Sequence, residues 1–391
     1  MAGYFKSIRD GFKLRNFTNY ILIAAALILF LILELTGVLR RSHANLLAQV
    51  GFSIILAVSL NLVVGFLGEL SLGHAGFMCA GAYIGCFVAN QLHKTSLPPL
   101  VTLIVAMAVG GIVAALFGFV VGLPALRLKG DYLAIVTLAF GEIVRNICKN
   151  LPWFGGAMGL PTEQYGTHLF IVAFAVVLLM LILTQNLIHS KHGRAITAIR
   201  DNEIAARAMG INVVFYKLFV FVFAAFFAGV AGVIYGYYTT PVIYSSFTFN
   251  YSIEILVMVV LGGMGNITGS ILSASLITVV NFVLQSNLSG DQAAIKYLVY
   301  ALILMVTILF NNAPAFRPIK EKIGLQAILS RVRKKFGLKH PSENPEEIVD
   351  DSAKWHRIPT KIKMDSILST DLKPADDGTL EPDPRQEDKH E

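Results

Sequence analysis

Apolar residues in this chain form long continuous stretches instead of the periodic pattern of a soluble domain. A helix needs about 20 mostly apolar residues to cross the hydrocarbon core of a bilayer. Nine stretches approach that length and a tenth is shorter: Tyr20–Val38, Leu46–Leu67, Gly73–Ala89, Leu100–Leu123, Tyr132–Ile147, His168–Ile188, Val214–Tyr237, Tyr251–Gly262, Ile267–Leu284 and Ala293–Phe310. The pattern predicts an all-α membrane protein of about ten transmembrane helices.

The composition and the placement of charge support a membrane protein. Of the 391 residues, 55% are hydrophobic and 15% are charged, whereas soluble domains carry about a quarter charged residues. Thirty of the 57 charged residues follow Ala315, so the residues before it hold too few charges to surround a water-soluble core. We therefore expect a cytoplasmic N-terminus at 1–19, a transmembrane domain at 20–312 and a cytoplasmic tail at 313–391.

The tail is expected to differ from the membrane domain. Apolar residues from Leu325 to Phe336 recur at helical spacing opposite a basic cluster, which predicts an amphipathic helix on anionic lipid headgroups. From His340 onward the chain is charged and rich in proline, so we expect mostly disorder there.

Lys and Arg in short loops predict the orientation, because cytoplasmic loops are enriched in them. With a cytoplasmic N-terminus and ten crossings, ten of these residues before the tail fall inside and five fall outside. Membrane topology therefore explains the net charge of +7. Binding to nucleic acid is not needed to explain it, since the sequence has no basic patch interleaved with aromatic residues. We expect a multi-pass protein of a bacterial-type cell membrane with both termini in the cytoplasm.

Ten crossings divide into two halves of five, which enter the membrane in opposite senses. Such inverted halves place a pathway at their interface, often lined by short or glycine-broken helices. The short stretch Tyr251–Gly262 and the glycine-containing segment Leu70–Gly76 fit this description. Glycines also recur four apart, as at Gly81 and Gly85, which allows helix backbones to approach closely.

The loop at residues 191–213 is the richest basic loop on the predicted cytoplasmic side. Asp201 or Asn202 can cap a short helix, Glu203 suits its first turn and Gly210 suits its end. Ala205, Ala206 and Ala208 leave the helix thin on one side, and Ile204 and Met209 project from it. Such a helix fits a groove in a soluble partner, although an ordinary solvated loop helix has the same pattern.

The segment Glu-Ile-Ala-Ala-Arg-Ala-Met-Gly at 203–210 resembles the coupling loop of ABC importer permeases. It has one residue between Glu203 and Ala205, as is usual in branched-chain amino acid permeases. Residues 61–83, 130–145 and 254–265 resemble the same family. The closest resemblance is to the second permease subunit of high-affinity branched-chain amino acid ABC importers, which implies the ABC importer permease fold.

The resemblance implies which residues couple to an ATPase and which partners assemble with the chain. The coupling residues are Arg200, Glu203, Ala205, Ala206 and Gly210. The partners are a second homologous permease, two cytoplasmic ATP-binding subunits and an extracytoplasmic substrate-binding protein. Relatives show a Thr-Gly-Gly turn where this chain has Trp153–Leu160, a segment expected to face the binding protein.

No catalytic or cofactor chemistry is expected of this chain. It lacks the G-x-x-x-x-G-K-[ST] phosphate loop, so ATP hydrolysis is assigned to another polypeptide. No nucleophile–base pair and no metal cluster appears at useful spacing in the sequence. We therefore expect a transport subunit that is not an enzyme, has no cofactor or metal, and contacts lipid but no nucleic acid.

Polar residues inside the predicted spans are candidates for the translocation path or its gate, since such residues are costly in a membrane and often functional. They are Asn61, Ser71, His74, Glu142, Arg145 and Glu254. The alternative is a packing role. Glu142 and Arg145 lie three apart and can pair within one helix, and a hydrogen bond from His74 to backbone near the glycine turn is expected.

The function implied by the resemblance is ATP-driven import of leucine, isoleucine and valine. Relatives of the same architecture import urea, short amides or other amino acids, and the sequence leaves these cargoes open. An ion-coupled secondary transporter also has inverted halves and buried carboxylates. It does not need the loop at 191–213, so replacing Glu203 or Gly210 discriminates between the two classes.

Overall fold

The chain divides into two compact units, Met1–Ala313 and Pro314–Glu391. In the computed structural model the described residues are 41–94, 98–125, 131–162, 168–287, 302, 372–374 and 380–382. The predicted spans Tyr20–Val38 and Ala293–Phe310 lie outside them, apart from Leu302, as does the predicted amphipathic helix of the tail. The pairing of two inverted halves therefore stays a prediction.

The other eight predicted spans are helices. They are α3 (Arg41–Asn61), α4 (His74–His93), α5 (Pro99–Ala125), α6 (Asp131–Asn150), α7 (Leu169–His189), α10 (Val213–Tyr238), α11 (Phe249–Gly262) and α12 (Ile267–Asn287). A short π-helix, η1 (Leu62–Leu67), continues α3. The all-α membrane fold predicted from the apolar stretches is confirmed.

Six helical segments of the described part are long and apolar enough to cross a membrane. They include every helix named above except α6 and α12. Helix α6 has 20 residues but carries Asp131, Glu142, Arg145 and Lys149, which lower its hydropathy. The apolar part of α12 ends at Val283 and is shorter.

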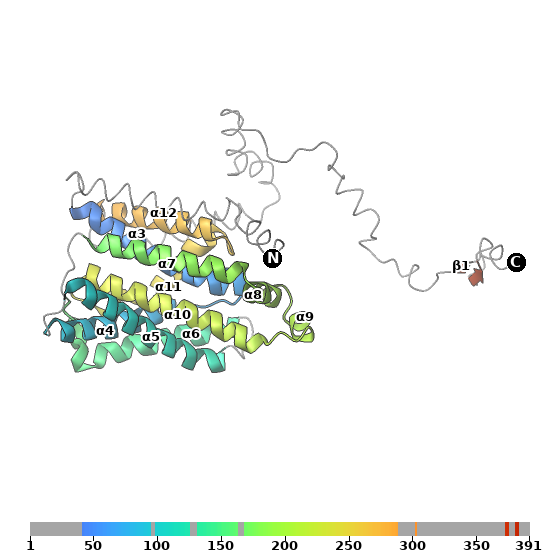
Figure 1. The fold of residues 1–391 in the computed structure, drawn as a ribbon, viewed down its shortest axis with the longest axis horizontal. Helices are drawn as coiled ribbons and strands as arrows, with labels where there is room; N and C mark the ends of the chain where they lie inside the picture. Colours follow the sequence, from blue (N-terminus) through green and yellow to red (C-terminus); the bar gives the residue numbers. More distant parts are fainter. Residues whose placement is uncertain are drawn as a thin grey trace, which may run out of the picture. The chain divides into compact units, whose positions relative to one another are not determined.

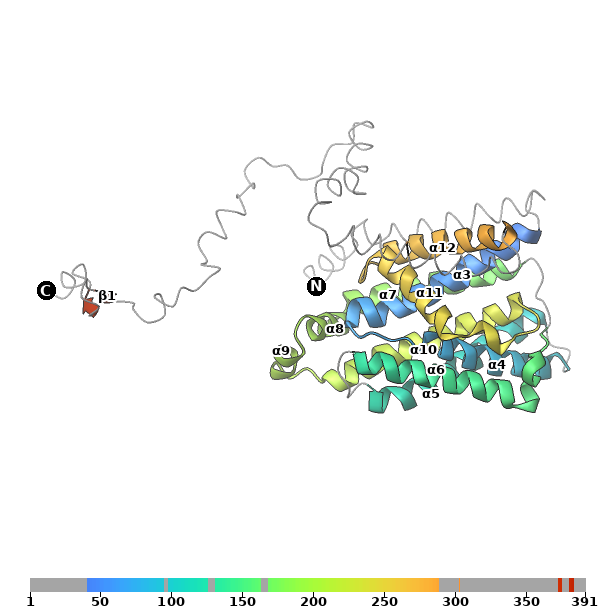
Figure 2. The same cartoon turned by 180° about the vertical axis from the view of Figure 1, so that it is seen from behind.

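The helices of the first unit lie alongside one another, as Figures 1 and 2 show. Helices α3, α7 and α12 form one side, α4, α5 and α6 form the other, and α10 and α11 lie between them. Helix α10 packs against α3, α4 and α5. Two further helices, α8 (Lys191–Asp201) and α9 (Glu203–Ala208), lie at one end of this bundle.

Glycines set the close crossing of α4 and α10. A Cβ atom added at Gly81 would lie 2.3 Å from the Cα of Gly229, and one added at Gly232 would lie 2.1 Å from the carbonyl oxygen of Met78. Both obstructing atoms belong to backbone, which cannot move aside as a flexible side chain can. The recurring small residues therefore pack helices within one chain, as expected for membrane bundles.

Three short 3-10 helices connect the longer elements. They are η2 (Pro152–Phe154), η3 (Gly156–Met158) and η4 (Tyr244–Ser246). In the second unit, β1 (Leu372–Pro374) pairs antiparallel with β2 (Leu380–Pro382), with Leu372 opposite Pro382. This hairpin lies in the segment for which the sequence predicts mostly disorder.

Candidate functional site

The loop at residues 191–213 contains two helices that are capped by their own side chains. The hydroxyl of Ser190 accepts hydrogen bonds from the amides of His192 and Gly193 at 3.1 and 3.2 Å, which starts α8. Asn202 accepts from the amide of Ala205 at 3.0 Å and starts α9. The prediction of a capped helix at 203–210 is confirmed, with Asn202 as the cap, whereas α8 was missed although Ser190 is a favourable N-cap.

An ionic cluster attaches α9 to the membrane helices. Lys217 of α10 is 4% exposed and pairs with Glu69, in the loop after η1. Its Nζ also lies 3.2 Å from Oε2 of Glu203, the first residue of α9. Arg207 pairs with the other oxygen of Glu203 at 2.8 Å. The two carboxylates and two cations of this Lys217 cluster balance in charge.

Sequence reasoning selected Glu203 but did not find its partner. Lys217 lies inside an apolar stretch of α10, where an ionisable residue is itself a signal of function. Its two carboxylate partners lie 148 and 14 positions away in the chain, so the sequence does not show that they meet.

Arg200 joins the end of α8 to the end of η1. Its Nη1 donates to the carbonyl oxygen of Gly65 at 3.1 Å, and its guanidinium also pairs with Asp201 at 3.0 Å. A pocket of about 410 Å³ lies between these segments, lined by residues from 67–69 and 199–204 together with Lys217. Two of the residues predicted to couple, Arg200 and Glu203, line this pocket.

The rest of α9 presents small and exposed side chains. Ala206 is buried against the bundle, whereas Ile204 and Met209 are 79% and 82% exposed. Gly210 has φ of +82°, the left-handed conformation that commonly ends helices and favours glycine. The helix is therefore held on one side and open on the other.

Two predicted path residues, Asn61 and Ser71, are buried near the end of α3, and Asn61 makes polar contacts between helices. Asn61 is fully buried; its Nδ2 donates to the Ser270 hydroxyl at 2.9 Å, and its Oδ1 accepts from the amide of Gly265 at 2.9 Å. Ser71 is buried, and its hydroxyl has no hydrogen-bond partner within the described residues. These contacts join the end of α3 to the turn between α11 and α12.

The expected partner of His74 was wrong. Its Nε2 lies 2.7 Å from the hydroxyl of Ser59 on α3, whereas a hydrogen bond to backbone near the glycine turn was expected. Since the Ser59 hydroxyl donates its hydrogen to the carbonyl of Leu56 at 2.9 Å, it accepts from the imidazole. Packing of α4 against α3 supplies this partner, which the local sequence around the glycine turn does not reveal.

Glu142 and Arg145 pair within α6. The guanidinium Nε and Nη2 atoms of Arg145 lie 2.9 and 2.5 Å from Oε2 of Glu142. Both side chains are about a quarter exposed. The intrahelical pair predicted from their three-residue spacing is confirmed, and it satisfies both charges locally.

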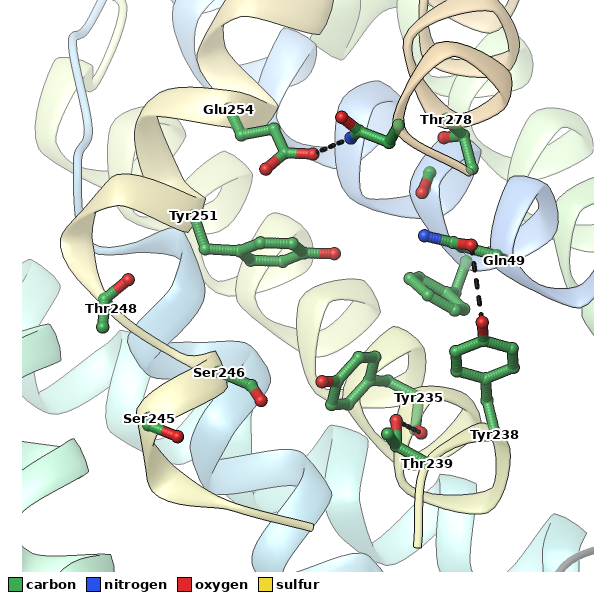
Figure 3. Close-up of a pocket in the computed structure, with 13 residues that line it drawn as sticks. Gln49, Tyr235, Tyr238, Thr239, Ser245, Ser246, Thr248, Tyr251, Glu254 and Thr278 are labelled. Carbon is green, nitrogen blue, oxygen red and sulfur yellow. Dashed lines mark hydrogen bonds between the residues drawn. The ribbon is translucent and has the colours of Figure 1, made fainter. Parts of the chain in front are cut away.

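A cavity between the membrane helices has a volume of about 390 Å³. Figure 3 shows its wall, which combines tyrosine rings with amide, hydroxyl and carboxyl groups. Its lining residues are Gln49, Phe52, Ser53, Tyr235, Tyr238, Thr239, Ser245, Ser246, Thr248, Tyr251, Glu254, Thr278 and Asn281. Of the predicted path residues, Glu254 alone is among them.

Glu254 and Asn281 form the most buried polar pair of this cavity. They are 6% and 3% exposed, and Nδ2 of Asn281 donates to the Glu254 carboxylate. On the facing side, the hydroxyl of Tyr238 donates to Oε1 of Gln49 at 3.5 Å. Tyr251 extends between these two groups with its hydroxyl toward Gln49 (Figure 3).

The sequence contains a signal that could have found this cavity. Three pairs of polar or aromatic residues lie three apart inside apolar stretches: Tyr235 with Tyr238, Tyr251 with Glu254, and Thr278 with Asn281. Residues three apart share a helix face. Each of the three helices therefore turns one such pair toward the same space.

The cavity and the Lys217 cluster lie toward opposite ends of α10. Lys217 is in the first turns of this helix and Tyr235 is near its end. At 1.5 Å per residue the two are about 27 Å apart along the axis. One helix thus connects the residues around α9 with the wall of the cavity.

Metal-ligand clusters are not found in the part of the chain that the structure describes, since no group of three His, Cys, Asp or Glu side chains gathers there. Its three cysteines, Cys79, Cys86 and Cys148, are buried and free. The polar interactions found among the described residues are hydrogen bonds and ion pairs.

Comparisons with known proteins identify relatives of this chain. It is 35% identical over 276 residues to the high-affinity branched-chain amino acid transport system permease protein LivM of Salmonella typhimurium, covering 61% of this chain and 63% of LivM. It is 37% identical over 264 residues to LivM of Escherichia coli, covering 58% and 60%. The chain thus matches less than two thirds of the length of these relatives.

A second type of permease matches more weakly. The chain is 23% identical over 288 residues to the permease protein LivH of Salmonella typhimurium, covering 69% of this chain and 92% of LivH. No solved structure matches the chain significantly.

The family described as branched-chain amino acid transport system / permease component matches residues 42–308, which is most of the first unit. The chain therefore belongs to this family of transport permeases.

Proposed function

We propose that this chain is the permease subunit of an ATP-binding cassette importer that carries leucine, isoleucine and valine across the cell membrane. The observation that carries the proposal is the exposure of α9, in a chain that belongs to this permease family. This helix is held to the membrane bundle by Lys217, while Ile204 and Met209 project from it into solvent. A helix that is anchored on one side and apolar on the other suits the transfer of motion from a bound partner.

The contacts around α9 support a mechanism for this transfer. Glu203 reaches α10 through Lys217, and Lys217 reaches the loop after η1 through Glu69. Arg200 holds η1 itself at the carbonyl oxygen of Gly65. A displacement of α9 by an ATPase would therefore act on α10 and η1 together, which assigns coupling to Arg200, Glu203, Ala205, Ala206 and Gly210.

The partners follow from the same proposal. The weaker similarity to LivH supports a second, homologous permease as the neighbour of this chain in the bilayer. Two ATP-binding subunits would bind on the cytoplasmic side, one of them at α9, and a substrate-binding protein would deliver cargo on the opposite side. The excess of Lys and Arg supports this orientation, with both termini cytoplasmic in a bacterial-type inner membrane.

The translocation path is assigned to the space between α3, α4, α11 and α12. Asn61, Ser71 and His74 are buried there, and Glu254 lines the cavity. These polar groups would offer successive hydrogen bonds to an amino acid between the two membrane faces. Glu142 and Arg145 pair with each other on α6, which supports a packing role or a gate beside the path.

The proposal is tested by purifying the tagged chain from membranes with its co-purifying proteins. We expect an ATPase to co-purify, and we expect uptake of leucine to require ATP. The double variant Ile204→Glu and Met209→Glu should remove the ATPase without lowering the melting temperature, because both side chains are exposed. Arg194→Glu is the control, since Arg194 is exposed on the neighbouring α8.

Other results would reject the proposal or change its cargo. Absence of any ATPase together with ATP-independent uptake would identify a secondary transporter. Retention of ATPase binding by the double glutamate variant would show that α9 is not the docking element. Uptake of urea or a short amide in place of leucine would keep the architecture and replace the cargo.

A further inference from the structure

Two glycine backbones meet where η1 touches the turn between α11 and α12. A Cβ atom added at Gly65 of η1 would lie 2.9 Å from the Cα of Gly265 in the turn. Asn61 spans the same contact, because its Oδ1 accepts from the Gly265 amide and its Nδ2 donates to the Ser270 hydroxyl, both at 2.9 Å. We call this contact of Gly65 with Gly265 the glycine joint. Its two sides are too close for a side chain to fit between them.

Arg200, the next-to-last residue of α8, lies on the glycine joint. Its Nη1 donates to the carbonyl oxygen of Gly65 at 3.1 Å, and a Cβ atom added at Gly265 would lie 3.5 Å from the same Nη1. Its Cγ covers Gly68, where an added Cβ atom would lie 2.8 Å away. Asp201 orients the guanidinium by accepting from Nε and Nη2 at 3.1 and 3.0 Å. One side chain from α8 therefore lies beside both glycines of the joint.

The glycine joint lies at one end of the proposed translocation path. The π-helix η1 continues α3, and the turn at 263–266 connects α11 to α12, so the joint belongs to three of the four helices around the path. π-helical turns are rare and occur frequently at functional sites, and glycine-broken segments often line transport pathways. Both sides of the joint are short segments outside the regular α-helices. They can therefore move apart without bending α3, α11 or α12.

We infer that the glycine joint is the cytoplasmic gate of the transport path and that Arg200 is the positioning residue that keeps it closed. The inference rests on the proposed function, in which an ATPase bound at α9 displaces this helix and the adjoining α8. Displacement of α8 withdraws the guanidinium from the Gly65 carbonyl, and η1 then separates from the turn. The separation opens a passage beside Asn61, whose amide offers hydrogen bonds to a passing substrate.

Opening of the gate is measured by the reactivity of a cysteine at Ser270, which is fully buried beside the joint. The three native cysteines are replaced by alanine, Ser270→Cys is introduced, and the full chain with its co-purifying proteins is placed in lipid nanodiscs without nucleotide. The thiol reagent 2-aminoethyl methanethiosulfonate then has access from both membrane faces. We expect Arg200→Ala to raise the labelling rate at least about tenfold, because the joint loses a charge-assisted hydrogen bond.

Two further variants assign this effect to the contact of Arg200 with the joint. Arg200→Lys keeps an aliphatic stem over Gly68 and one donor for the Gly65 carbonyl, so its labelling should be several-fold slower than that of Arg200→Ala. Arg194→Ala is the matched control, because it removes an exposed arginine of the same helix α8. Its labelling rate should equal that of the unaltered arginines.

A second cysteine separates local opening from general loss of structure. Cys86 is fully buried in α4 and lies against Gly236, near the opposite end of α10 from Lys217. It is kept as the single cysteine in a parallel protein that retains Ser270. Its labelling should stay slow in the presence of Arg200→Ala, since the gate and not the bundle is opened.

Transport by the same complex distinguishes holding the gate from docking the ATPase. With Arg200→Ala, the ATPase should stay bound and hydrolyse ATP. ATP-dependent uptake of leucine into proteoliposomes should fall about tenfold, because a gate that stays open does not give access to the two faces in alternation. Arg200→Lys should recover part of the uptake, which a loss of docking would not predict.

Three results would overturn the inference: unchanged labelling of Ser270→Cys by Arg200→Ala, an equal rise at Cys86, or an equal rise with Arg194→Ala. Failure of the proposed function is distinguishable. A chain that binds no ATPase but shows the labelling change with Arg200→Ala would reject the importer proposal alone. ATP-dependent leucine uptake with unchanged labelling would reject this inference alone.

Discussion

Lys217 is the residue on which three segments of the chain converge. It is a buried cation of α10 that contacts Glu69 after η1 and Glu203 at the start of α9. Burying a charge is costly unless it is paired and hydrogen-bonded. The two carboxylates meet this requirement, and their own repulsion is relieved by the lysine between them.

Replacing Lys217 by Met should therefore destabilise the protein strongly. Removing one partner of a buried ion pair leaves uncompensated charge and costs about 3 kcal/mol. We expect a clear fall in the melting temperature of the detergent-solubilised protein, measured by thermal unfolding. Adding Glu69→Gln to Lys217→Met should restore part of the loss, because one of the two unpaired carboxylates is then neutral.

The control for this prediction is Lys191→Met, since Lys191 is an exposed lysine at the start of α8. It should leave the melting temperature nearly unchanged. Equal melting temperatures for Lys217→Met and the unaltered protein would contradict the ionic role of Lys217.

At the scale of single residues, prediction from the sequence worked where the partners are near in the chain. The Glu142–Arg145 pair was predicted because three-residue spacing brings two side chains to one helix face. The partner of His74 was not, because Ser59 belongs to another helix and is 15 positions away. Helix geometry is local, whereas helix packing is not.

At the scale of elements, the crossing of α4 and α10 depends on the absence of side chains. A Cβ atom on Gly81 would meet the Cα of Gly229 at 2.3 Å. Gly141 of α6 is also buried, but the nearest atoms to its added Cβ would lie at 3.6 Å, an ordinary contact distance. The two positions form a matched pair of helical glycines.

We predict opposite effects for the two alanine substitutions. Gly81→Ala should lower the free energy of unfolding by about 1 to 3 kcal/mol, as overpacking does. Gly141→Ala should be neutral or stabilising, because alanine favours the helix by about 1 kcal/mol over glycine. Thermal unfolding of both variants tests this, and an equal loss in both would contradict backbone contact at the α4–α10 crossing.

The predicted elements differ in how they were found. The end residues of α9 were recognised from Asn202 and Gly210, because caps are local interactions. Helix α6 was predicted as a span from its apolar residues. It is long enough to cross a membrane, but its four charged residues lower its hydropathy, so the length of a helix and its apolar character are separate properties. Helix α8 was missed because its apolar residues are few, although its N-cap at Ser190 is visible in the sequence.

At the scale of the whole membrane unit, one helix separates the two surfaces on which the proposed partners would dock. Met158 is exposed after α6, and Met209 is exposed after α9. Between them the chain passes once along α7, which is long and apolar enough to cross a membrane. The two methionines should therefore lie on opposite faces of the bilayer.

This prediction is tested with single cysteines. The buried Cys79, Cys86 and Cys148 are first replaced by alanine, and cysteine is then introduced at Met158 or at Met209. A membrane-impermeant maleimide should label Met158→Cys in intact cells and Met209→Cys in inverted vesicles. Labelling of both from the same side would contradict a crossing by α7, and exchange of the two sides would reverse the proposed orientation.

The sequence by itself determined most of the described elements of this protein and the location of α9, the helix proposed to couple to an ATPase. Apolar length, helix caps and spacing along one helix depend on neighbouring residues, so eight spans and the capped α9 were predictable. The tertiary structure alone decided which polar groups meet. Asn61 bonds to Ser270, 209 positions away, and Lys217 pairs with Glu69, 148 positions away. The cavity around Glu254 is assembled from several helices. Side chains that are distant in the chain become neighbours only when helices pack, so the sequence alone does not show these contacts.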